Sequence, residues 1–314
     1  MFAILPIICY TVPMAMMFLT AAEIAERWQV SERSVRNYCA LGRVPGAILQ
    51  GKTWLIPVDA SKPQRQRRHS LSRKAPTVLE VLRREREAAL RGGLYHKIQI
   101  DFTFNSNHIE GSRLTHDQTR YIFETKTVGA VGESLPVDDI VETANHFRCI
   151  DLVIDAATSK LTEGFIKQLH LVLKNGTSDS LKTWFRVGGY KLLENEVGGQ
   201  PTTPPKEVSA RMKSLLSSYN AITAATFDDI LHFHVEFESI HPFQDGNGRI
   251  GRLLLFKECL RHNITPFIIT EELKYFYYRG LKEWHQQRGY LRDTCLTAQD
   301  AMKDVLGQLG LLVE

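Results

Sequence analysis

The twelve residues from His241 to Arg252 constrain this chain more than any other segment. They read HPFQDGNGRIGR and lie between two stretches, 227–240 and 250–260, whose apolar residues recur with helical spacing. Proline, glycine and asparagine interrupt that spacing, which predicts a loop between two core helices. The 314 residues, 43% of them hydrophobic, suggest about two domains of ordinary globular composition. Long helical stretches from about residue 76 onward predict a mainly α fold.

The second half of this loop has the features of a polyphosphate site. Gly246-Asn247-Gly248 lets a ligand approach the backbone without meeting a Cβ atom. The free N–H groups at the start of the following helix favour an anion. Arg249 and Arg252 are three positions apart, so they are expected to project from one side of the first helical turn.

The first half of the loop carries two groups suited to phosphoryl chemistry. Asp245 lies next to the predicted anion site, where a carboxylate is a plausible Mg²⁺ ligand. His241 precedes it by four residues, and an imidazole with an ordinary pKa near 6.5 suits a base that takes a proton from a hydroxyl. A glycine-rich turn or a single histidine is usually structural, but the combination within twelve residues favours a catalytic site.

These residues closely resemble the signature of the Fic family, His-Pro-Phe-x-[Asp/Glu]-Gly-Asn-Gly-Arg-x-x-Arg, and every specified position is met here. The resemblance covers roughly residues 95–290. It implies a helical bundle with a β-hairpin flap that moves AMP from ATP, with Mg²⁺, to a Ser, Thr or Tyr hydroxyl of a target protein. By position it implies that His241 is the general base, Asp245 the Mg²⁺ ligand, Gly246, Asn247 and Gly248 the phosphate cradle, Arg249 and Arg252 the distal-phosphate ligands, and Phe243 the anchor of the loop.

A second segment resembles the flap of this family. Residues 188–205 contain the one later stretch that reads as a strand, from about Tyr190 to Val197. In the family, the target chain pairs with this hairpin as an added strand. Lys191 stands where the family usually has arginine. The alternative is an ordinary surface hairpin.

A third segment, Ser106-Asn-His-Ile-Glu110-Gly111, resembles the family's inhibitory motif, on a helix expected near 98–111. Ser106 and Glu110 are four apart and share a helix face. The resemblance implies that Glu110 pairs with Arg252 and competes with the γ-phosphate for it. In some members this glutamate supports removal of AMP, so hydrolysis is a further alternative, as is a surface glutamate without a role.

The region before residue 75 differs in charge from the rest. Residues 18–74 hold 11 Lys/Arg against 4 Asp/Glu, a net charge of +7, whereas residues 75–314 hold 28 against 31, a net charge of −3. A basic module joined to a mildly acidic body is typical of a nucleic-acid-binding unit, and a solvated basic surface is the alternative.

Residues 18–60 are predicted to form a winged helix-turn-helix. Thr20 and Glu23 form a capping box, a second helix runs from Ser31 to near Gly42, and 47–57 is a hairpin. The segment resembles excisionase-like, MerR-related modules. We expect Val35 and Leu41 to face inward. Helices of this kind read the major groove, and a helical hairpin for protein contacts or dimerisation is the alternative. The residues expected to face DNA are Arg33, Arg36 and Asn37.

The remaining expectations concern the boundaries and the compartment. We interpret residues 1–17, which are apolar and uncharged, as a disordered extension or a mis-assigned start, with a cleaved signal as the alternative. Residues 61–75 read as a basic linker whose Arg65–Arg68 run would contact phosphates, and 76–314 as the Fic domain. Five widely spaced cysteines argue against disulfides and a zinc site and favour the cytoplasm. We expect no membrane partner. We expect the chain to form a homodimer.

Two overall hypotheses follow. The first is a self-restrained AMP transferase whose target is another protein or the chain itself. The second is a DNA-binding regulator in which the catalytic body senses a nucleotide or modifies its own chain.

Two groups of residues outside the motifs are expected to be structural. His232 and His234 should point to different faces of one helix and hold no shared metal. The aromatic cluster 275–278 should pack against the rest of the domain.

Overall fold

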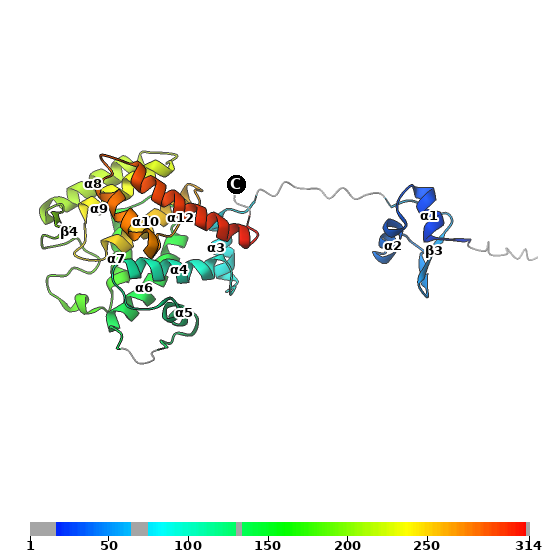
Figure 1. Cartoon of the computed structure of the whole chain (residues 1–314), viewed down its shortest axis with the longest axis horizontal. Helices are drawn as coiled ribbons and strands as arrows, with labels where there is room; N and C mark the ends of the chain where they lie inside the picture. The colour runs from blue at the N-terminus through cyan, green and yellow to red at the C-terminus, as the bar shows by residue number, and fades with distance from the viewer. Residues whose placement is uncertain (1–16, 64–74, 130–133, 312–314) are drawn as a thin grey trace, which may run out of the picture. The chain divides into compact units, whose positions relative to one another are not determined.

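The computed structural model describes residues 17–63, 75–129 and 134–311 (Figure 1). The chain forms two compact units, Met1–Ser72 and Arg73–Glu314. The expectations for residues 1–16 and for the Arg65–Arg68 run fall outside the described residues.

The N-terminal unit combines two short helices with a three-stranded antiparallel sheet of order β1-β3-β2. Thr20 begins the first helix with the expected capping box: its hydroxyl accepts from the Glu23 N–H, and the Glu23 carboxylate accepts from the Thr20 N–H. Ser31 caps the second helix. In chain order the elements are β1 (Phe18–Thr20), α1 (Ala21–Trp28), α2 (Glu32–Ala40), β2 (Ile48–Gln50) and β3 (Thr53–Pro57).

The core of this unit corrects one prediction and supports another. Ile24, Val35 and Ile56 are fully buried and hold the helices on the sheet. Leu41, expected to face inward, is 71% exposed because it follows the last residue of α2 as its C-cap. The side chains of Arg33, Arg36 and Asn37 are exposed on α2, as expected.

The second unit is a bundle of helices with a two-stranded hairpin, β4 and β5 (Figure 1). Its elements are α3 (Val78–Glu87), α4 (Leu94–Ile109), α5 (His116–Thr125), α6 (Val137–Asp155), α7 (Glu163–Lys174), the 3-10 turn η1 (Ser178–Leu181), β4 (Glu196–Val197), β5 (Gln200–Pro201), α8 (Pro205–Asn220), α9 (Phe227–Ile240), α10 (Asn247–Arg261), the 3-10 turn η2 (Glu271–Leu273), α11 (Lys274–Lys282) and α12 (Gly289–Gln308).

Helix α10 is the centre of this bundle. It packs against α9, α6, α4 and α7, and residues on all of its sides are buried, including Ile250, Leu253 and Phe256 at 0% exposure. A helix that is buried all round belongs to the core rather than to a surface. The loop before α10 is therefore attached at both ends to elements that cannot shift without disturbing the core.

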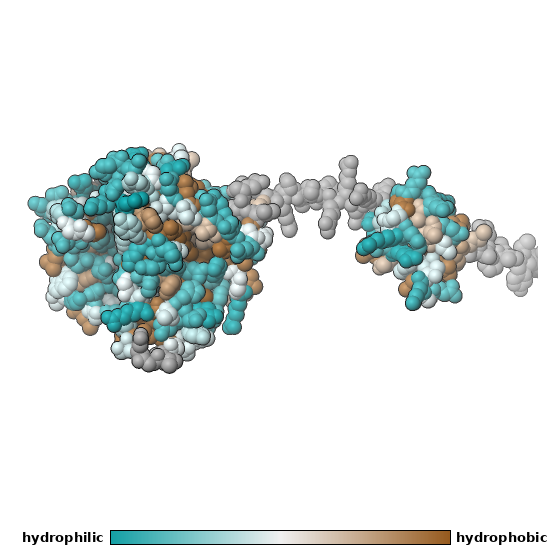
Figure 2. Space-filling view, viewed as in Figure 1, coloured by the Kyte–Doolittle hydropathy of each residue, from teal (hydrophilic) through white to brown (hydrophobic). Residues whose placement is uncertain are grey.

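The flap differs from the prediction. The expected strand 190–197 is reduced to Glu196–Val197, which pairs with Gln200–Pro201. Residues 190–195 instead run along the loop between α9 and α10, called the motif loop below. Polar groups of these residues form hydrogen bonds to that loop rather than to a second strand. The face of the unit seen in Figure 2 is mostly hydrophilic with scattered apolar residues. None of the helices in the described ranges has both the length and the apolar character needed to cross a bilayer.

The remaining expectations are met in part. His232 is exposed and His234 is buried, so the two side chains do lie on different faces of α9. Of the aromatic cluster, Tyr277 packs at 1% exposure, but Tyr275 is 71% exposed, because only one face of α11 meets the bundle. The cysteines within the described residues are free.

Candidate active site

The loop between α9 and α10 is locked by its own side chains. Asn247 accepts from the Phe243 N–H through Oδ1 and donates to the Phe243 carbonyl through Nδ2, both at 2.8 Å. The Phe243 ring is fully buried and stacks on His170 at 4.0 Å between ring centroids. Phe243 is thus the core anchor that was expected. Both polar atoms of the Asn247 side chain thus take part in the lock.

His241 ends α9 in the left-handed region, at φ 51°. Its Nδ1 lies 3.3 Å from the Glu238 carbonyl oxygen. Because a carbonyl only accepts, Nδ1 carries the proton and Nε2 is left as an acceptor. Burial, with a smaller effect of the nearby Lys191 charge, lowers the pKa of His241 to about 4. The ring is therefore neutral at physiological pH and able to take a proton.

The start of α10 already holds one anion, the carboxylate of Glu110. Gly246 precedes the helix at φ 81°, and Gly248 lies in its first turn. A Cβ atom on Gly248 would lie 2.2 Å from Glu110 Oε1, so only glycine leaves room for this carboxylate. Glu110 follows the last residue of α4 as its C-cap rather than lying within the helix.

Arg252 fixes that carboxylate. Its Nη2 donates to Glu110 Oε1 at 2.7 Å and to the Ser106 carbonyl at 2.8 Å, and its Nε donates to Ser106 Oγ at 3.0 Å. The guanidinium is 4% exposed. Burial acts to lower the pKa of Arg252, but the negative charge of Glu110 has the larger effect, so the pKa of Arg252 is raised above its usual value. The pairing implied by the family resemblance is present.

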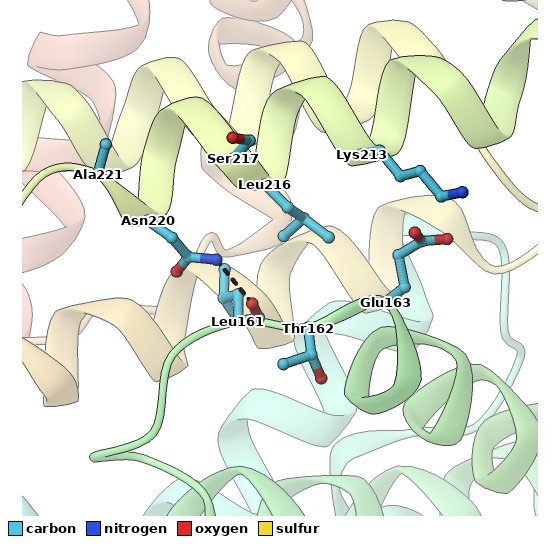
Figure 3. A pocket seen from close by; sticks show the side chains of 8 residues that line it. All are labelled: Leu161, Thr162, Glu163, Lys213, Leu216, Ser217, Asn220 and Ala221. Carbon is cyan, nitrogen blue, oxygen red and sulfur yellow. Dashed lines mark hydrogen bonds between the residues drawn. The ribbon is translucent and has the colours of Figure 1, made fainter.

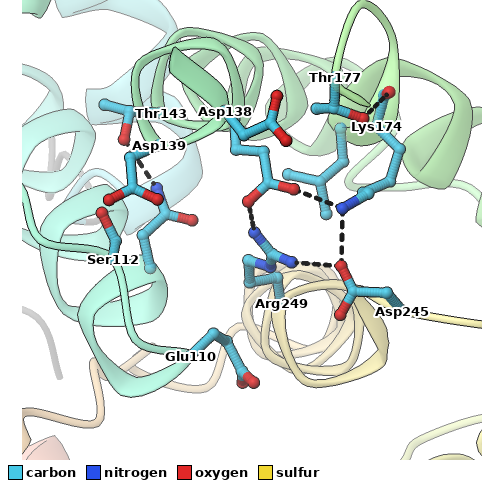
Figure 4. A network of polar contacts seen from close by, with 12 residues as sticks. Glu110, Ser112, Asp138, Asp139, Thr143, Lys174, Thr177, Asp245 and Arg249 are labelled. Atoms are coloured by element: carbon cyan, nitrogen blue, oxygen red, sulfur yellow. Dashed lines mark hydrogen bonds and ion pairs between the residues drawn. The ribbon is translucent and has the colours of Figure 1, made fainter. Parts of the chain in front are cut away.

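Arg249 points to different partners from Arg252. It is ion-paired with Glu142 of α6 and, at 3.0 Å, with Asp245 Oδ2 (Figure 4). Each guanidinium is thus held by a separate carboxylate, Arg249 by Glu142 of α6 and Arg252 by Glu110 at the end of α4.

Asp245 has a second cationic partner that the sequence did not indicate. Lys174, the last residue of α7, donates to Asp245 Oδ2 at 2.6 Å (Figure 4). Burial acts to raise the pKa of Asp245, but Arg249 and Lys174 outweigh it and hold that pKa well below its usual range. Asp245 is ionised, 49% exposed, and has an oxygen outside these ion pairs, a donor that fits Mg²⁺. Lys174 and Glu142 belong to no local motif and could not be found from spacing.

The flap is fastened to the loop by hydrogen bonds. The Lys191 N–H donates to the Pro242 carbonyl at 2.9 Å, and Asn195 Nδ2 donates to the Phe243 carbonyl at 3.1 Å. The Leu193 N–H donates to Gln244 Oε1 at 3.2 Å. The Lys191 ammonium is 3% exposed and bridges Asn195 and Thr202, which closes the flap on itself.

A separate open groove lies between the start of α7 and the second half of α8 (Figure 3). Leu161, Leu216 and Asn220 line it, and Asn220 Nδ2 donates to the Leu161 carbonyl at 2.8 Å. It contains none of the motif residues, so the loop and the flap remain the candidate site.

Comparison with known proteins agrees with this geometry. Residues 160–258 match the model of the Fic/DOC family. Over 221 residues, 69% of this chain, the chain is 27% identical to the protein adenylyltransferase Fic of Aedes aegypti and covers 41% of that relative. Over 214 residues, 64% of this chain, it is 26% identical to the protein of the same name from Drosophila persimilis and covers 37% of it. The chain thus spans about two fifths of the length of these relatives.

Solved structures share the fold. A Fic domain containing signaling protein from Bacteroides thetaiotaomicron superposes with a TM-score of 0.59 at 23% identity, covering 75% of this chain and 98% of the other. Fic-1 from C. elegans gives 0.57 at 19% identity, covering 74% and 72%. In sequence, residues 160–258 are thus similar to the Fic/DOC family, and the second unit shares its fold with these solved structures.

Proposed function

We propose that this protein is an adenylyltransferase that moves AMP from ATP to a Ser, Thr or Tyr hydroxyl of a target protein or of the chain itself. The observation that carries the proposal is the Glu110 carboxylate held by Arg252 over Gly248. A site that binds one anion at the start of a helix, beside a neutral histidine, has the features that a nucleotide phosphate requires. The names of the curated relatives support the same activity.

The chemistry follows from His241. Its unprotonated Nε2 accepts the proton of the target hydroxyl as that oxygen attacks the α-phosphorus. The new P–O bond forms while the bond to pyrophosphate breaks, and N–H groups of the first turn of α10 stabilise the charge on the phosphate oxygens. Asp245 would hold Mg²⁺, which when bound neutralises phosphate charge.

Glu110 restrains this reaction in the proposal. Its carboxylate occupies Arg252 and lies against the first turn of α10, so a γ-phosphate would meet a filled and repelling site. The nucleotide would then bind in a pose unsuited to in-line attack. The same carboxylate would also suit holding a water for removal of AMP, which makes hydrolysis the alternative activity of the site.

The test is the mass of intact protein after incubation with ATP and Mg²⁺. We expect labelling of the chain or of an added target in Glu110→Gly, where the restraint is removed, and a fall of about a hundredfold or more when His241→Ala is added. His232→Ala in the same background, an exposed histidine on the same helix, is the matched control. Equal labelling of Glu110→Gly with and without His241→Ala would refute the mechanism. Loss of AMP from a target modified beforehand would favour the hydrolytic alternative.

A second function is proposed for the N-terminal unit, namely binding of duplex DNA as a pair of chains. It is supported by the exposed Arg33, Arg36 and Asn37 on α2, on a segment of net charge +7. We expect affinity to fall steeply with salt, and Arg33→Ala with Arg36→Ala to weaken binding to a preferred sequence about tenfold or more. Arg292→Ala, an exposed arginine of the other unit, is the control. Absence of binding at low salt would eliminate this function.

A further inference from the structure

Lys174 lies at the centre of a cage of carboxylates, defined here as Glu142, Asp179 and Asp245. The lysine side chain is 2% exposed and its Nζ contacts all three, at 2.7 Å from Asp179 and 2.6 Å from Asp245. One carboxylate oxygen from each of the three residues lies within 4.8 Å of the others. Three anionic partners at this distance stabilise the buried ammonium.

Arg249 and Lys174 close a cycle of ion pairs with two of these carboxylates. Lys174 contacts Glu142 Oε1 and Arg249 contacts Glu142 Oε2, so both oxygens of Glu142 are used. Both cations also contact the same oxygen of Asp245, Oδ2. The cycle therefore joins α6, α7 and α10 to the motif loop through charge alone (Figure 4).

The third carboxylate, that of Asp179, is paired with two lysines. Asp179 contacts Lys174 through Oδ2 and Lys182 through Oδ1. Of the six oxygens of the cage, five are therefore engaged by a cation. The sixth, Asp245 Oδ1, takes part in none of these ion pairs and belongs to a side chain that is 49% exposed.

We infer that Lys174 is a positioning residue for Asp245: its ammonium fills the carboxylate cage and leaves Oδ1 of Asp245 as the single oxygen offered to a divalent cation. Glu142 and Asp179 are not cation ligands while the ammonium is in place. The inference rests on the proposed function, because that function assigns the cation to Asp245. It predicts that a divalent cation binds with the nucleotide and does not settle in the cage beforehand.

Replacing the ammonium by a group of similar length should expose the cage. Lys174→Met leaves Glu142 and Asp245 with Arg249, and Asp179 with Lys182, as their remaining cations. Carboxylate oxygens are good ligands for hard cations. We expect Mn²⁺ alone, titrated calorimetrically without nucleotide, to bind Lys174→Met about tenfold or more tightly than wild type. Lys182→Met is the matched control, because Lys182 contacts Asp179 but not Asp245. It should bind Mn²⁺ as wild type does.

A second variant keeps the inference testable if Lys174→Met does not fold. Asp179→Asn removes one carboxylate at the edge of the cage and leaves Lys174 with its two others. We expect the Mg²⁺ concentration for half-maximal nucleotide binding to stay within about twofold of wild type. A rise of fivefold or more would make Asp179 a ligand and overturn the inference, as would equal Mn²⁺ binding by wild type and Lys174→Met. The Mn²⁺ titration needs no turnover, so it decides this point even if the protein transfers no AMP.

Discussion

The Glu110 carboxylate lies 2.7 Å from the Arg252 guanidinium, although 142 positions separate the two residues in the chain. One comes from the end of α4 and the other from the second turn of α10. Arg252 is 4% exposed, so a ligand that needs this guanidinium must displace the carboxylate. In the proposed function a phosphate would compete with Glu110 for this cation, which would couple the position of α4 to the occupancy of the site.

Removing this carboxylate should release the activity. We expect Glu110→Gly to raise ATP-dependent labelling about tenfold or more, because Arg252 and the first turn of α10 become free for a phosphate. Labelling measured by intact mass checks it. Glu283→Gly is the matched control, since Glu283 is also a helix C-cap, at the end of α11. A Glu110→Gly protein no more active than wild type would rule out restraint by Glu110.

The pH dependence of the reaction should follow His241. Its pKa is lowered to about 4, so the ring is unprotonated throughout the range from pH 6 to 8. We therefore expect that titration of His241 leaves kcat/KM unchanged from pH 6 to 8. As the pH approaches 4, kcat/KM should fall, because protonation of Nε2 removes the proton acceptor. A pH profile that declines below about 6.5, the ordinary value, would show that burial does not depress this pKa.

Stability should also depend on buried histidine. Burial lowers the pKa of His234 to about 3, whereas its value in the unfolded chain is near 6.5. The unfolded state thus binds more protons between these two values, and stability falls by about 1.4 kcal/mol per pH unit as the pH drops through this window. Chemical denaturation of His234→Asn should show a shallower decline than wild type. His232→Asn, on the exposed side of α9, should match wild type.

The lock between Asn247 and Phe243 should contribute both stability and activity. Asn247→Ala removes two buried hydrogen bonds to the Phe243 backbone, which we expect to cost about 2 kcal/mol of unfolding free energy. Because the lock shapes the loop that carries His241, labelling should fall as well. Asn105→Ala loses one hydrogen bond on α4, to the Asp101 carbonyl, and should cost less. Equal losses in the two variants would contradict a special role for the lock.

The sequence predicted the parts of the fold that depend on local order. Helices α9 and α10 and the loop between them follow from apolar spacing, and the caps at Thr20 and Ser31 follow from residue types. The prediction for Leu41 was wrong because helical spacing was extended one residue beyond the end of α2. The strand β1 was missed because three residues carry too little pattern, and its pairing partner lies at the far end of the unit.

The site was predictable only where its residues are neighbours in sequence. His241, Asp245 and Arg252 stand within twelve positions, and the resemblance added Glu110 from a distant segment. Lys174 and Glu142 were missed because one ends an ordinary helix and the other lies within one, and only packing of α6, α7 and α10 brings their charges together. The proposed roles of the site residues and the DNA contacts remain predictions that the variants above address.

The enclosure of α10 has a consequence for how such a protein can be controlled. A helix surrounded by others cannot tilt or slide to switch its first turn on and off without breaking up the centre of the molecule. The first turn of α10 therefore keeps one fixed shape, whether or not it receives a phosphate as proposed. If the proposed site is regulated, the change has to come from α4 and the Glu110 side chain that follows it.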